Sequence, residues 1–450
     1  MGRLFGTDGI RGVANEYPLT AEAVFGIGRA VASFFGSSAH PAKIIIGKDT
    51  RESGDMIEDA LASGICSVGA DASLAGILPT PAVAHLVSSN DAAAGIVISA
   101  SHNPFGDNGI KIFDADGYKL SDAKEDEIEC LLPAHNIDLA PGKFNHRIGN
   151  VETMRDAPER YLAFLQNTLP DAKLFNDMKI VLDCSNGATY AVAPKLFQDL
   201  GAQVEALHIR PDGKNINADC GSEHPETLIE AVLAQNADIG LAFDGDGDRL
   251  VAVDEKGQII SGDRTLVICA RSLKRKGLLK NNLVVSTVMS NLGLRLALKD
   301  LGINHIMAQV GDRYVLQQMN ANGAVIGGED SGHMIFLDQH TTGDGMLTAI
   351  RLIQTMCEEK KPLSELSRVM TVFPQVLLNI DVQKKPLIEE VPQIMAVIRS
   401  VEECLGEKGR VLVRYSGTQP LCRVMVEGPE KDETRRYCQQ IADVVKATLS

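Results

Sequence analysis

The chain has 450 residues, of which 44% are hydrophobic, and a formal net charge of -15 at pH 7. Its lysines and arginines are spread along the sequence, which argues against a nucleic-acid-binding protein or one that binds an anionic membrane surface. An anionic small substrate is not excluded, but its site must then concentrate Arg and Lys locally. Since a domain typically has about 100–200 residues, length alone predicts roughly three domains.

The nine cysteines are scattered and form no C-x-x-C pair. An odd number without such pairs argues against a disulfide framework or a thiolate zinc site, and we expect reduced cysteines in a cytoplasmic protein. The first residues lack the apolar h-region of a signal peptide. No apolar run is long enough to span a bilayer.

Residues 1–155 alternate between helical and extended patterns, which predicts an α/β domain whose sheet is covered by helices on both faces. The expected elements are a helix over 19–35 with Thr20 as its N-cap, a strand over 43–47, a helix over 53–64, a strand over 70–75 and a helix that opens at Thr80-Pro81.

The most informative stretch of this domain is Gly95–Lys111. The apolar run Ile96–Ile98 predicts a buried strand, a Gly-Asp-Asn-Gly turn is expected at 106–109, and Lys111–Phe113 should pair back as a strand. The first strand ends at Ser99, Ser101 and His102. Because ligands of open α/β sheets bind at the carboxyl ends of strands, a hydroxyl here is a candidate nucleophile. A polar turn explains an isolated S-x-S-H-N-P equally well.

Two further α/β patterns follow, over 156–256 and 257–370, and each has an apolar strand that exits into small polar residues. Their expected elements are strands over 179–183, 203–208, 238–243 and 283–287 and helices over 191–200 and 291–301. Residues 371–450 predict a smaller α+β domain after a hinge near Thr371–Gln375, with strands over 375–382 and 410–413 and a helix over 431–449.

Asp244, Asp246 and Asp248 lie in F-D-G-D-G-D-R, the strongest local signal. The intervening glycines let all three carboxylates face one point, where a hard cation such as Mg²⁺ would relieve their repulsion. A solvated acidic turn is one alternative. The other is an EF-hand with Glu255 at its twelfth position, but Arg249 stands where that loop requires glycine.

Three more polar loops carry candidate site residues. G-G-E-D-S-G-H at 327–333 offers Glu329, Ser331 and His333, which suit hydroxyl recognition on a sugar. The phosphate-binding composition of R-Y-S-G-T-Q-P comes from Arg414, Ser416, Gly417 and Thr418. The N-terminal G-T-D-G-I-R-G adds Arg11. Alone, each loop could be an ordinary polar turn.

Together these residues fit one reaction. A phosphate on Ser101, held by Mg²⁺ on the three aspartates, passes to a sugar phosphate whose own phosphate binds Arg414, Ser416 and Thr418. Lys111 and His333 are the candidate proton carriers, and Arg11 and Arg249 would steady charge on the transferring group.

The chain resembles the α-D-phosphohexomutase superfamily nearly end to end. The motifs are F-G-T-D-G-I-R-G-V-A-N at 5–15, D-T-R-x-S-G at 49–54, I-S-A-S-H-N-P, N-I-N-A-D-C-G-S-E-H-P at 215–225, D-G-D-G-D-R, G-D-R-Y-V at 311–315, and the loops G-G-E-D-S-G-H and R-Y-S-G-T-Q-P described above. The motifs at 5–15 and 215–225 point to the glucosamine branch of the superfamily.

The resemblance implies four domains: 1–155 with the phosphoserine, 156–256 with the metal loop, 257–370 with the sugar loop and 371–450 with the phosphate loop, arranged as a heart around a central cleft. It implies interconversion of glucosamine 6-phosphate and glucosamine 1-phosphate through a bisphosphate intermediate, on the route to UDP-N-acetylglucosamine. It also implies one Mg²⁺ per chain, a phosphate on Ser101, and glucose 1,6-bisphosphate or glucosamine 1,6-bisphosphate as activator. A monomer or homodimer is expected.

The residue roles that follow from the resemblance are catalysis by Ser101, Lys111, His333, Arg11 and His102; substrate binding by Glu329, Ser331, His333, Arg414, Ser416, Gly417, Thr418 and Arg423; metal binding by Ser101, Asp244, Asp246 and Asp248; and charge stabilisation by Arg249. Asp330, Tyr415 and Gln419 depart from the branch's usual pattern. The alternatives are a phosphoglucomutase/phosphomannomutase of the same superfamily and, more remotely, a non-catalytic Ca²⁺-binding protein built around 244–255.

Overall fold

The structure is a computed structural model of the chain and describes residues 4–6, 8–36, 41–132, 147–170, 173–416 and 420–449. The chain forms two compact units. Unit 1 comprises Met1–Val288 and Ile306–Ser367, and unit 2 comprises Met289–His305 and Arg368–Ser450. Among the described residues, no helix has both the length and the apolar composition needed to cross a membrane.

The first sheet of unit 1 has six strands in the order β1-β5-β4-β2-β3-β6. Its strands are β1 (Ile10–Val13), β2 (Lys43–Lys48), β3 (Asp71–Ile77), β4 (Ala94–Ile98), β5 (Asp107–Asp114) and β6 (Val151–Thr153). β2 runs parallel to β3 and β4, while β5 pairs antiparallel with β4 and β1, so the sheet is mixed as predicted. All five residues of β4 are buried, which places its carboxyl end at the centre of the domain.

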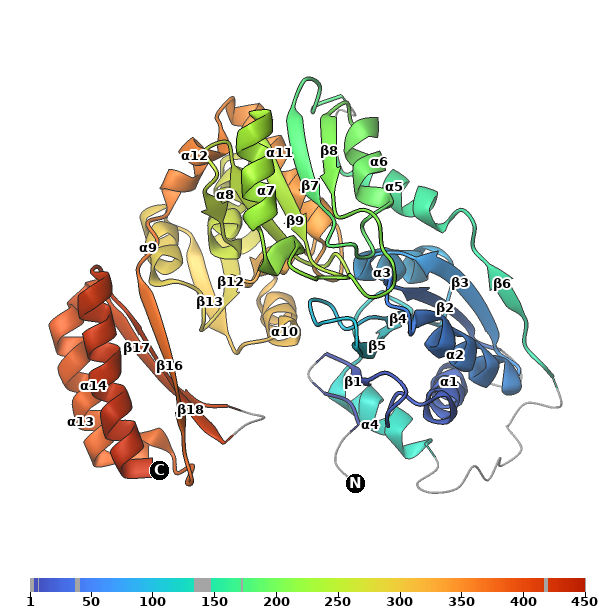
Figure 1. Cartoon of the computed structure of the whole chain (residues 1–450), viewed down its shortest axis with the longest axis horizontal. Coiled ribbons are helices and arrows are strands. Elements are labelled where there is room, and N and C mark those ends of the chain that lie inside the picture. Colours follow the sequence, from blue (N-terminus) through green and yellow to red (C-terminus); the bar gives the residue numbers. More distant parts are fainter. Residues whose placement is uncertain are drawn as a thin grey trace. The chain divides into compact units, whose positions relative to one another are not determined.

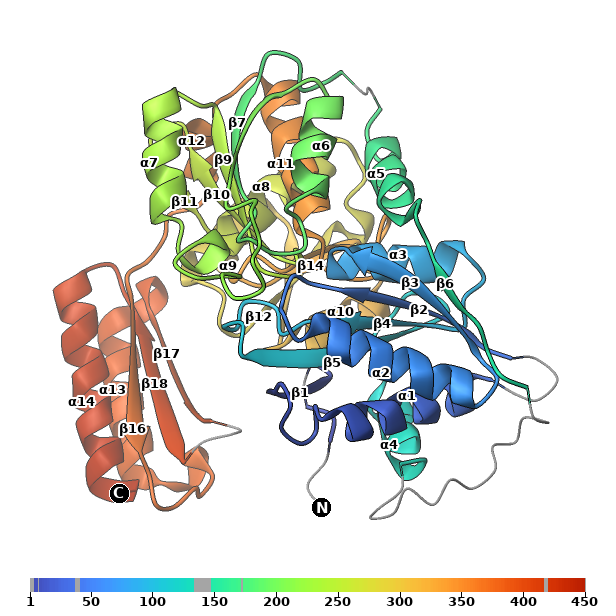
Figure 2. The same ribbon diagram turned by 45° about the vertical axis from the view of Figure 1, so that its right-hand side comes forward.

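Helices cover both faces of this sheet (Figures 1 and 2). They are α1 (Ala21–Phe35), α2 (Gly54–Ser67), α3 (Thr80–Ser89) and α4 (Asp122–Cys130). α1 and α2 pack together so closely that a Cβ on Gly28 would lie 2.5 Å from the Leu61 carbonyl oxygen. α3 covers the opposite face, where Val83 and Val87 fill the space above Gly47 and Gly95.

The second sheet has five strands in the order β11-β10-β9-β7-β8. They are β7 (Lys179–Asp183), β8 (Gln203–Leu207), β9 (Ile239–Phe243), β10 (Leu250–Asp254) and β11 (Ile259–Ile260), and the accompanying helices are α5 (Ala157–Asn167), α6 (Val192–Asp199) and α7 (Glu226–Gln235). β10 pairs antiparallel with β9 directly after the acidic turn. Since an EF-hand requires a helix at that point, this alternative is wrong.

The third sheet has four strands in the order β13-β12-β14-β15. They are β12 (Leu283–Thr287), β13 (Asn304–Ala308), β14 (Ile326–Gly328) and β15 (Met334–Phe336), with helices α8 (Gly262–Arg275), α10 (Asp312–Asn322), α11 (Gly345–Glu359) and α12 (Leu363–Leu366). Asp344 caps α11 by accepting from the backbone N–H of Leu347 at 2.9 Å.

Unit 2 is built on an antiparallel sheet in the order β16-β18-β17, with two long helices packed against it (Figure 1). Its elements are α9 (Leu292–Asp300), β16 (Gln375–Asp381), α13 (Pro392–Leu405), β17 (Arg410–Tyr415), β18 (Leu421–Glu427) and α14 (Lys431–Leu449). Ile394, Ile398, Ile441 and Val445 from the helices meet Val424 and Val426 of the sheet in one core. Short 3-10 helices complete the described chain: η1 (Gly221–Glu223), η2 (Lys280–Asn282), η3 (Ser367–Val369), η4 (Ile388–Glu390) and η5 (Gly406–Lys408).

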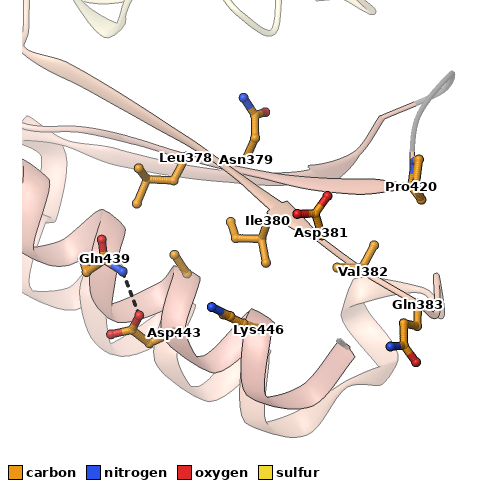
Figure 3. A pocket seen from close by; sticks show the side chains of 11 residues that line it. Leu378, Asn379, Ile380, Asp381, Val382, Gln383, Pro420, Gln439, Asp443 and Lys446 are labelled. Carbon is orange, nitrogen blue, oxygen red and sulfur yellow. Dashed lines mark hydrogen bonds between the residues drawn. The ribbon is translucent and has the colours of Figure 1, made fainter.

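Unit 2 has a pocket of about 500 Å³ beside β16 and α14 (Figure 3). Asp381 and Lys446 line it, together with Gln439 and Asp443, whose side chains are hydrogen-bonded to each other at 2.7 Å. None of the described residues predicted to bind substrate lines this pocket, so we assign it no part in the site.

Most predicted elements are confirmed to within a few residues, and the helix over 431–449 is confirmed as α14. The turn predicted at 106–109 is wrong in part, because Asp107, Asn108 and Gly109 already belong to β5 and pair with β1. The chain reverses earlier, between Ser101 and Gly106. The predicted helix over 291–301 is present as α9, but it packs with unit 2, where a Cβ on Gly293 would lie 1.9 Å from the Thr371 carbonyl oxygen.

Candidate active site

Ser101 lies in the loop that follows β4, buried to 2% exposure. Its hydroxyl donates to Asp244 Oδ2 at 2.6 Å and lies 3.4 Å from His102 Nδ1. Neighbouring Ser99 donates instead to Asp49 Oδ2 at 2.5 Å. Of the two serines, Ser101 alone therefore has its oxygen directed at the acidic turn.

The acidic turn directly follows β9, so the end of a buried strand fixes its position. Asp244, Asp246 and Asp248 are all buried, and their ligand atoms lie within 4.8 Å of one another. Gly245 allows this turn to approach the serine loop, because a Cβ there would lie 2.5 Å from the Ser101 carbonyl oxygen. The turn and the serine loop thus meet through backbone, which leaves the three carboxylates grouped around Ser101.

The donor set fits a magnesium ion. Asp246 Oδ1 and Asp248 Oδ1 are buried without a hydrogen-bond partner among the described residues. A buried carboxylate oxygen with no partner is costly, and a hard divalent cation is the ligand that best satisfies several of them at once. Burial and repulsion from Asp248 and Asp246 also raise the pKa of Asp244, which a bound cation would reverse.

Lys111, on β5, is the cation closest to the acidic turn. It is 1% exposed, and its Nζ lies 2.7 Å from Asp246 Oδ2, 3.2 Å from Asp8 Oδ2 and 3.5 Å from Asp248 Oδ2. Burial lowers the pKa of Lys111, but the Asp246, Asp8 and Asp248 carboxylates outweigh burial and raise it above its ordinary value. The sequence predicted Lys111 as a proton carrier, whereas this arrangement favours a fixed positive charge.

His333 reaches the same turn from the loop before β15. Its Nδ1 lies 3.5 Å from Asp248 Oδ2 and its Nε2 lies 3.8 Å from Asp312 Oδ2. Burial lowers the pKa of His333, but the Asp248 and Asp312 carboxylates together outweigh burial, so the pKa is raised overall. Gly343 covers the ring so closely that a Cβ there would lie 2.4 Å from it.

Arg249 and Arg11 bring positive charge from two other directions. Arg249 Nη1 lies 3.8 Å from Glu223 Oε1, and Arg11 Nη2 donates to Asp8 Oδ2 at 2.7 Å. Burial lowers the pKa of Arg249, but the nearby carboxylates, first those of Asp244 and Asp248, outweigh burial, so the pKa is raised overall. His102 behaves in the opposite way, since burial and then Arg249 lower its pKa and favour a neutral ring.

The sugar loop lies between β14 and β15. Glu329 Oε1 accepts from the backbone N–H of Gly311 at 3.0 Å, and Ser331 is exposed. Asp330, which departs from the branch pattern, accepts from the N–H of Asp263 in the first turn of α8 at 3.2 Å. Its carboxylate therefore stabilises a helix N-terminus.

Several residues of this site were missed from the sequence. Lys119 Nζ lies 2.5 Å from Asp8 Oδ1 and also pairs with Asp312, and Thr80 donates to Asp246 Oδ2 at 2.6 Å. Asp8 and Asp312 stand in motifs already quoted for the resemblance, G-T-D-G-I-R and G-D-R-Y-V, which could have indicated them. Neither Thr80 nor Lys119 lies in such a motif.

A second group with metal-ligand chemistry is formed by Asp183 at the end of β7, His208 directly after β8 and Cys220 directly before η1. Asp183 already accepts from the backbone N–H groups of Ser185 and Gly221, each at 2.9 Å, and His208 Nδ1 lies 3.0 Å away. The hydrogen bond to Asp183 raises the pKa of His208. With both oxygens of Asp183 accepting from backbone, these contacts fix the loops and need no metal.

The predicted phosphate-binding residues of unit 2 lie on adjacent strands. Arg414 of β17 stands directly opposite Arg423 of β18, and Ser416, at the end of β17, is buried. Arg423 Nε is buried without a partner among the described residues, and burial followed by repulsion from Arg423 lowers the pKa of Arg414. Two opposed arginines form a natural anion site. Gly417 and Thr418 lie outside the described residues, as does Gln419.

Comparisons with known proteins agree with this geometry. The four domain models of the phosphoglucomutase/phosphomannomutase family match residues 2–136 (domain I), 159–257 (domain II), 261–373 (domain III) and 377–444 (C-terminal domain). A phosphoglucosamine mutase of Syntrophus aciditrophicus is 59% identical, and one of Syntrophobacter fumaroxidans is 57% identical; both matches cover 100% of each chain. The crystal structure of a phosphoglucomutase/phosphomannomutase family protein from Burkholderia thailandensis has a TM-score of 0.81 and 26% identity, covering 99% of this chain and 97% of that one.

The fold and the site define an enzyme of the phosphohexomutase class, which transfers a phosphoryl group within a sugar phosphate. The chain belongs to the phosphoglucomutase/phosphomannomutase family, within the α-D-phosphohexomutase superfamily.

Proposed function

We propose that the chain catalyses the phosphoglucosamine mutase reaction, the interconversion of glucosamine 6-phosphate and glucosamine 1-phosphate on the route to UDP-N-acetylglucosamine. The substrate assignment rests on full-length relatives of that name at 59% and 57% identity. The observation that carries the mechanism is the 2.6 Å hydrogen bond from Ser101 Oγ to Asp244, within a buried triad of aspartates.

In the proposed reaction a phosphoryl group moves from Ser101 Oγ to the free hydroxyl of the sugar phosphate. That hydroxyl loses its proton to a base, and Ser101 Oγ gains a proton. The resulting glucosamine 1,6-bisphosphate turns around and returns its other phosphoryl group to Ser101. Both transfers need close positioning and charge neutralisation more than covalent chemistry, and this site offers both.

Each charged residue has a place in this scheme. Asp244, Asp246 and Asp248, with Ser101 Oγ, would hold one Mg²⁺. When bound, the ion supplies positive charge to the transferring phosphoryl group. Lys111, Arg11 and Arg249 would steady that charge. Lys111 and Arg249 lie beside the triad, and Arg11 pairs with Asp8, which Lys111 also contacts.

His333 and His102 are the proposed proton carriers nearest to the triad. His333 Nε2 is buried without a hydrogen-bond partner among the described residues, so a proton at this atom is free for a sugar oxygen. His102 Nδ1 faces Ser101 Oγ at 3.4 Å, which suits a neutral ring that receives or returns the serine proton.

Substrate binding is assigned to two groups of residues. Glu329 and Ser331, with His333, would bind the sugar hydroxyls. Arg414, Ser416 and Arg423, with Gly417 and Thr418, would bind the phosphate that is not being transferred. Support for the second group comes from the opposed arginines on β17 and β18.

The domain limits proposed from the sequence are 1–155, 156–256, 257–370 and 371–450. The ranges matched by the family models begin and end close to these limits. We further propose a cytoplasmic monomer or homodimer with a sugar phosphate as its small-molecule substrate, activated by glucose 1,6-bisphosphate or glucosamine 1,6-bisphosphate. The described cysteines are all free, which agrees with a reducing compartment.

Peptide mass spectrometry of freshly purified protein tests the mechanism. We expect one phosphate, on Ser101, or its appearance there after incubation with glucose 1,6-bisphosphate. The mechanism is wrong if Ser101 carries no phosphate under either condition. Ser101→Ala should abolish turnover, whereas Ser99→Ala should still take up phosphate.

The sugar is tested separately by comparing kcat/KM for the 6-phosphates of glucosamine, glucose and mannose. We expect glucosamine 6-phosphate to be preferred. The family models and the Burkholderia structure, both named for phosphoglucomutase/phosphomannomutase, keep that activity as the alternative. A clear preference for glucose or mannose would establish it.

A further inference from the structure

Ser101 is held in a backbone conformation that an L-residue rarely adopts, with φ of +53°. Such a conformation persists only where the surroundings fix it, and it is common where a side chain must be presented in one direction. Here it directs Oγ at Asp244. The groups that hold the Ser101 backbone therefore decide where the hydroxyl points.

Arg51 is the main support of the serine loop. It is 3% exposed, and its guanidinium donates to the carbonyl oxygens of Ser101 at 3.0 Å, Asn103 at 2.8 Å and Asp107 at 3.0 Å, and also to that of Pro104. One planar group with five N–H donors thus binds four carbonyls of a single loop.

Asp49 orients Arg51 and closes the network from the other side. Its Oδ2 accepts from Arg51 Nε at 2.9 Å and from the Ser99 hydroxyl at 2.5 Å. Ser99 Oγ in turn accepts from the backbone N–H of Ser101 at 3.0 Å. Both the N–H and the C=O of Ser101 are therefore fixed by the D-T-R segment that precedes α2.

Asn217 supplies a second donor from the loop between β8 and η1. Its Nδ2 donates to the carbonyl oxygens of Ser101 at 2.9 Å and Asn103 at 3.1 Å. Asn217 itself has φ of +57°, and its backbone N–H donates to the Ser185 carbonyl at 2.9 Å. Asp183 contacts this loop at both ends, through His208 Nδ1 at 3.0 Å and the N–H of Gly221 at 2.9 Å.

We propose that Arg51 and Asn217 are positioning residues that together hold the Ser101 carbonyl and keep Oγ aligned with the aspartate triad. The proposal rests on the proposed function, since it assigns these residues to the phosphoryl-transfer step. It also gives the contacts of Asp183 with His208 and Gly221 a purpose, because they anchor the loop that carries Asn217. Neither Arg51 nor Asn217 touches the transferring group, so their loss should slow transfer and leave substrate binding intact.

Asn217→Gly is the decisive variant, because glycine accepts the positive φ and only the two hydrogen bonds are lost. Asn236→Gly is its matched control: Asn236 also has positive φ, +50°, and is an exposed residue at the end of α7. We expect Asn217→Gly to lower kcat about tenfold to hundredfold with KM within twofold of wild type. Asn236→Gly should leave both constants unchanged.

Single-turnover transfer from phosphorylated Ser101 to the sugar phosphate, followed by quenching and mass spectrometry, locates the loss in the chemical step. Circular dichroism at the assay temperature checks that the variant is folded. A fall in kcat of less than tenfold, or a loss that appears as a raised KM, overturns the proposal. Arg51→Lys, which keeps the charge but not the fork of donors, should show the same loss of kcat if it folds.

Failure of this proposal differs from failure of the proposed function. If wild-type protein carries no phosphate on Ser101 and does not turn over, the mutase mechanism is wrong. If wild type turns over and Asn217→Gly transfers phosphate equally fast, only the positioning role is wrong.

Discussion

Four buried atoms around the aspartate triad lack a hydrogen-bond partner among the described residues, and they are of two opposite kinds. Asp246 Oδ1 and Asp248 Oδ1 are acceptors without donors, whereas Arg249 Nε and His333 Nε2 are donors without acceptors. Because a buried polar atom is rarely left unpaired, the acceptors require a cation and the donors require an anion. A metal ion and a phosphoryl group together would satisfy both sets. A site for a cation alone, or for an anion alone, would leave one of the two sets unpaired.

Lys111 is the cation that neutralises part of this carboxylate group. We expect its substitution to reveal the repulsion among these carboxylates. Lys111→Met leaves Asp8, Asp246 and Asp248 without their shared cation, and breaking a buried ion pair typically costs about 3–5 kcal/mol. We expect a lower melting temperature that added Mg²⁺ raises more in the variant than in wild type. Differential scanning calorimetry with and without Mg²⁺ measures both effects.

The control for Lys111→Met is Lys119→Met, since Lys119 pairs with Asp8 and Asp312 but with no member of the aspartate triad. Its melting temperature should respond to Mg²⁺ as wild type does. An identical Mg²⁺ response in all three proteins contradicts the role given to Lys111.

The residues predicted from the sequence were those in short motifs whose chemistry is local. Three aspartates two residues apart imply a shared cation whatever the fold, and Ser101 stands at the end of an obvious strand. Thr80 and Lys119 could not be found this way, because their neighbours in the site, Asp246 and Asp312, are 166 and 193 residues away in sequence. Only the packing of the sheets brings them together.

The contact between the acidic turn and the serine loop depends on a missing side chain. A Cβ at Gly245 would lie 2.5 Å from the Ser101 carbonyl oxygen and 2.7 Å from Asn217 Nδ2. Gly245→Ala should therefore push the two loops apart and lower kcat about a hundredfold, at a cost of about 1–3 kcal/mol in stability. Steady-state kinetics and thermal unfolding test this.

Gly106→Ala is the matched substitution in the same serine loop, because nothing lies within 4 Å of the Cβ it would add. It should keep wild-type kcat. Equal kinetics for Gly245→Ala and Gly106→Ala would show that the close approach of the loops is not needed for transfer.

The cap of α11 makes stability depend on pH. Asp344 accepts from Leu347 N–H and from the Tyr161 hydroxyl at 2.8 Å, and burial raises its pKa from 3.8 to about 6. A raised folded pKa contributes stability that is fully present below about pH 3.8 and is lost as pH rises through about 6. At 1.36 kcal/mol per unit, the loss is on the order of 3 kcal/mol at most.

Asp344→Asn keeps an N-cap but removes the titration. The melting temperature of the variant relative to wild type should therefore be higher at pH 7 than at pH 4.5. The reference variant is Ser121→Asp at the N-cap of α4, where Ser121 is exposed and the introduced carboxylate is expected to titrate near its ordinary value. A pH-independent difference between Asp344→Asn and wild type would refute the assignment.

Strands and helices with clear apolar periodicity were predicted well, since burial of one face leaves a pattern in the sequence. The turn at 106–109 was misplaced because Gly and Asn are typical of turns, whereas here Asn108 and Gly109 lie in β5 beside β1. Gly109 is needed because a Cβ there would lie 2.7 Å from the Ser99 carbonyl oxygen. A close approach between distant segments uses the same residue as a turn, so the sequence alone does not separate the two.

The residues assigned to the proposed reaction come from both units of the chain. The groups proposed for phosphoryl transfer lie in unit 1, and the opposed arginines lie in unit 2. The grouping of 289–305 with unit 2 was not predictable from its helix–strand pattern, which resembles those of the preceding domains. The Asn291 side chain donates to the Phe373 carbonyl oxygen at 2.9 Å and accepts from the Phe373 N–H at 3.0 Å. Such bonds between distant residues leave no hydrophobic periodicity in the sequence.

This division predicts that a variant in unit 2 changes KM while variants near Ser101 change kcat. Arg414 and Arg423 stand directly opposite on adjacent strands, where like charges destabilise a sheet by about 0.2–1 kcal/mol. Arg423→Met removes the repulsion and should raise the melting temperature slightly. It also removes a charge-assisted bond to phosphate worth about 1.5–3 kcal/mol, so KM for the sugar phosphate should rise about tenfold to hundredfold while kcat stays within twofold.

The control is Arg436→Met, at an exposed arginine on α14 of the same unit, which should change neither constant. A gain in stability without a rise in KM would contradict a role of Arg423 in binding the substrate phosphate.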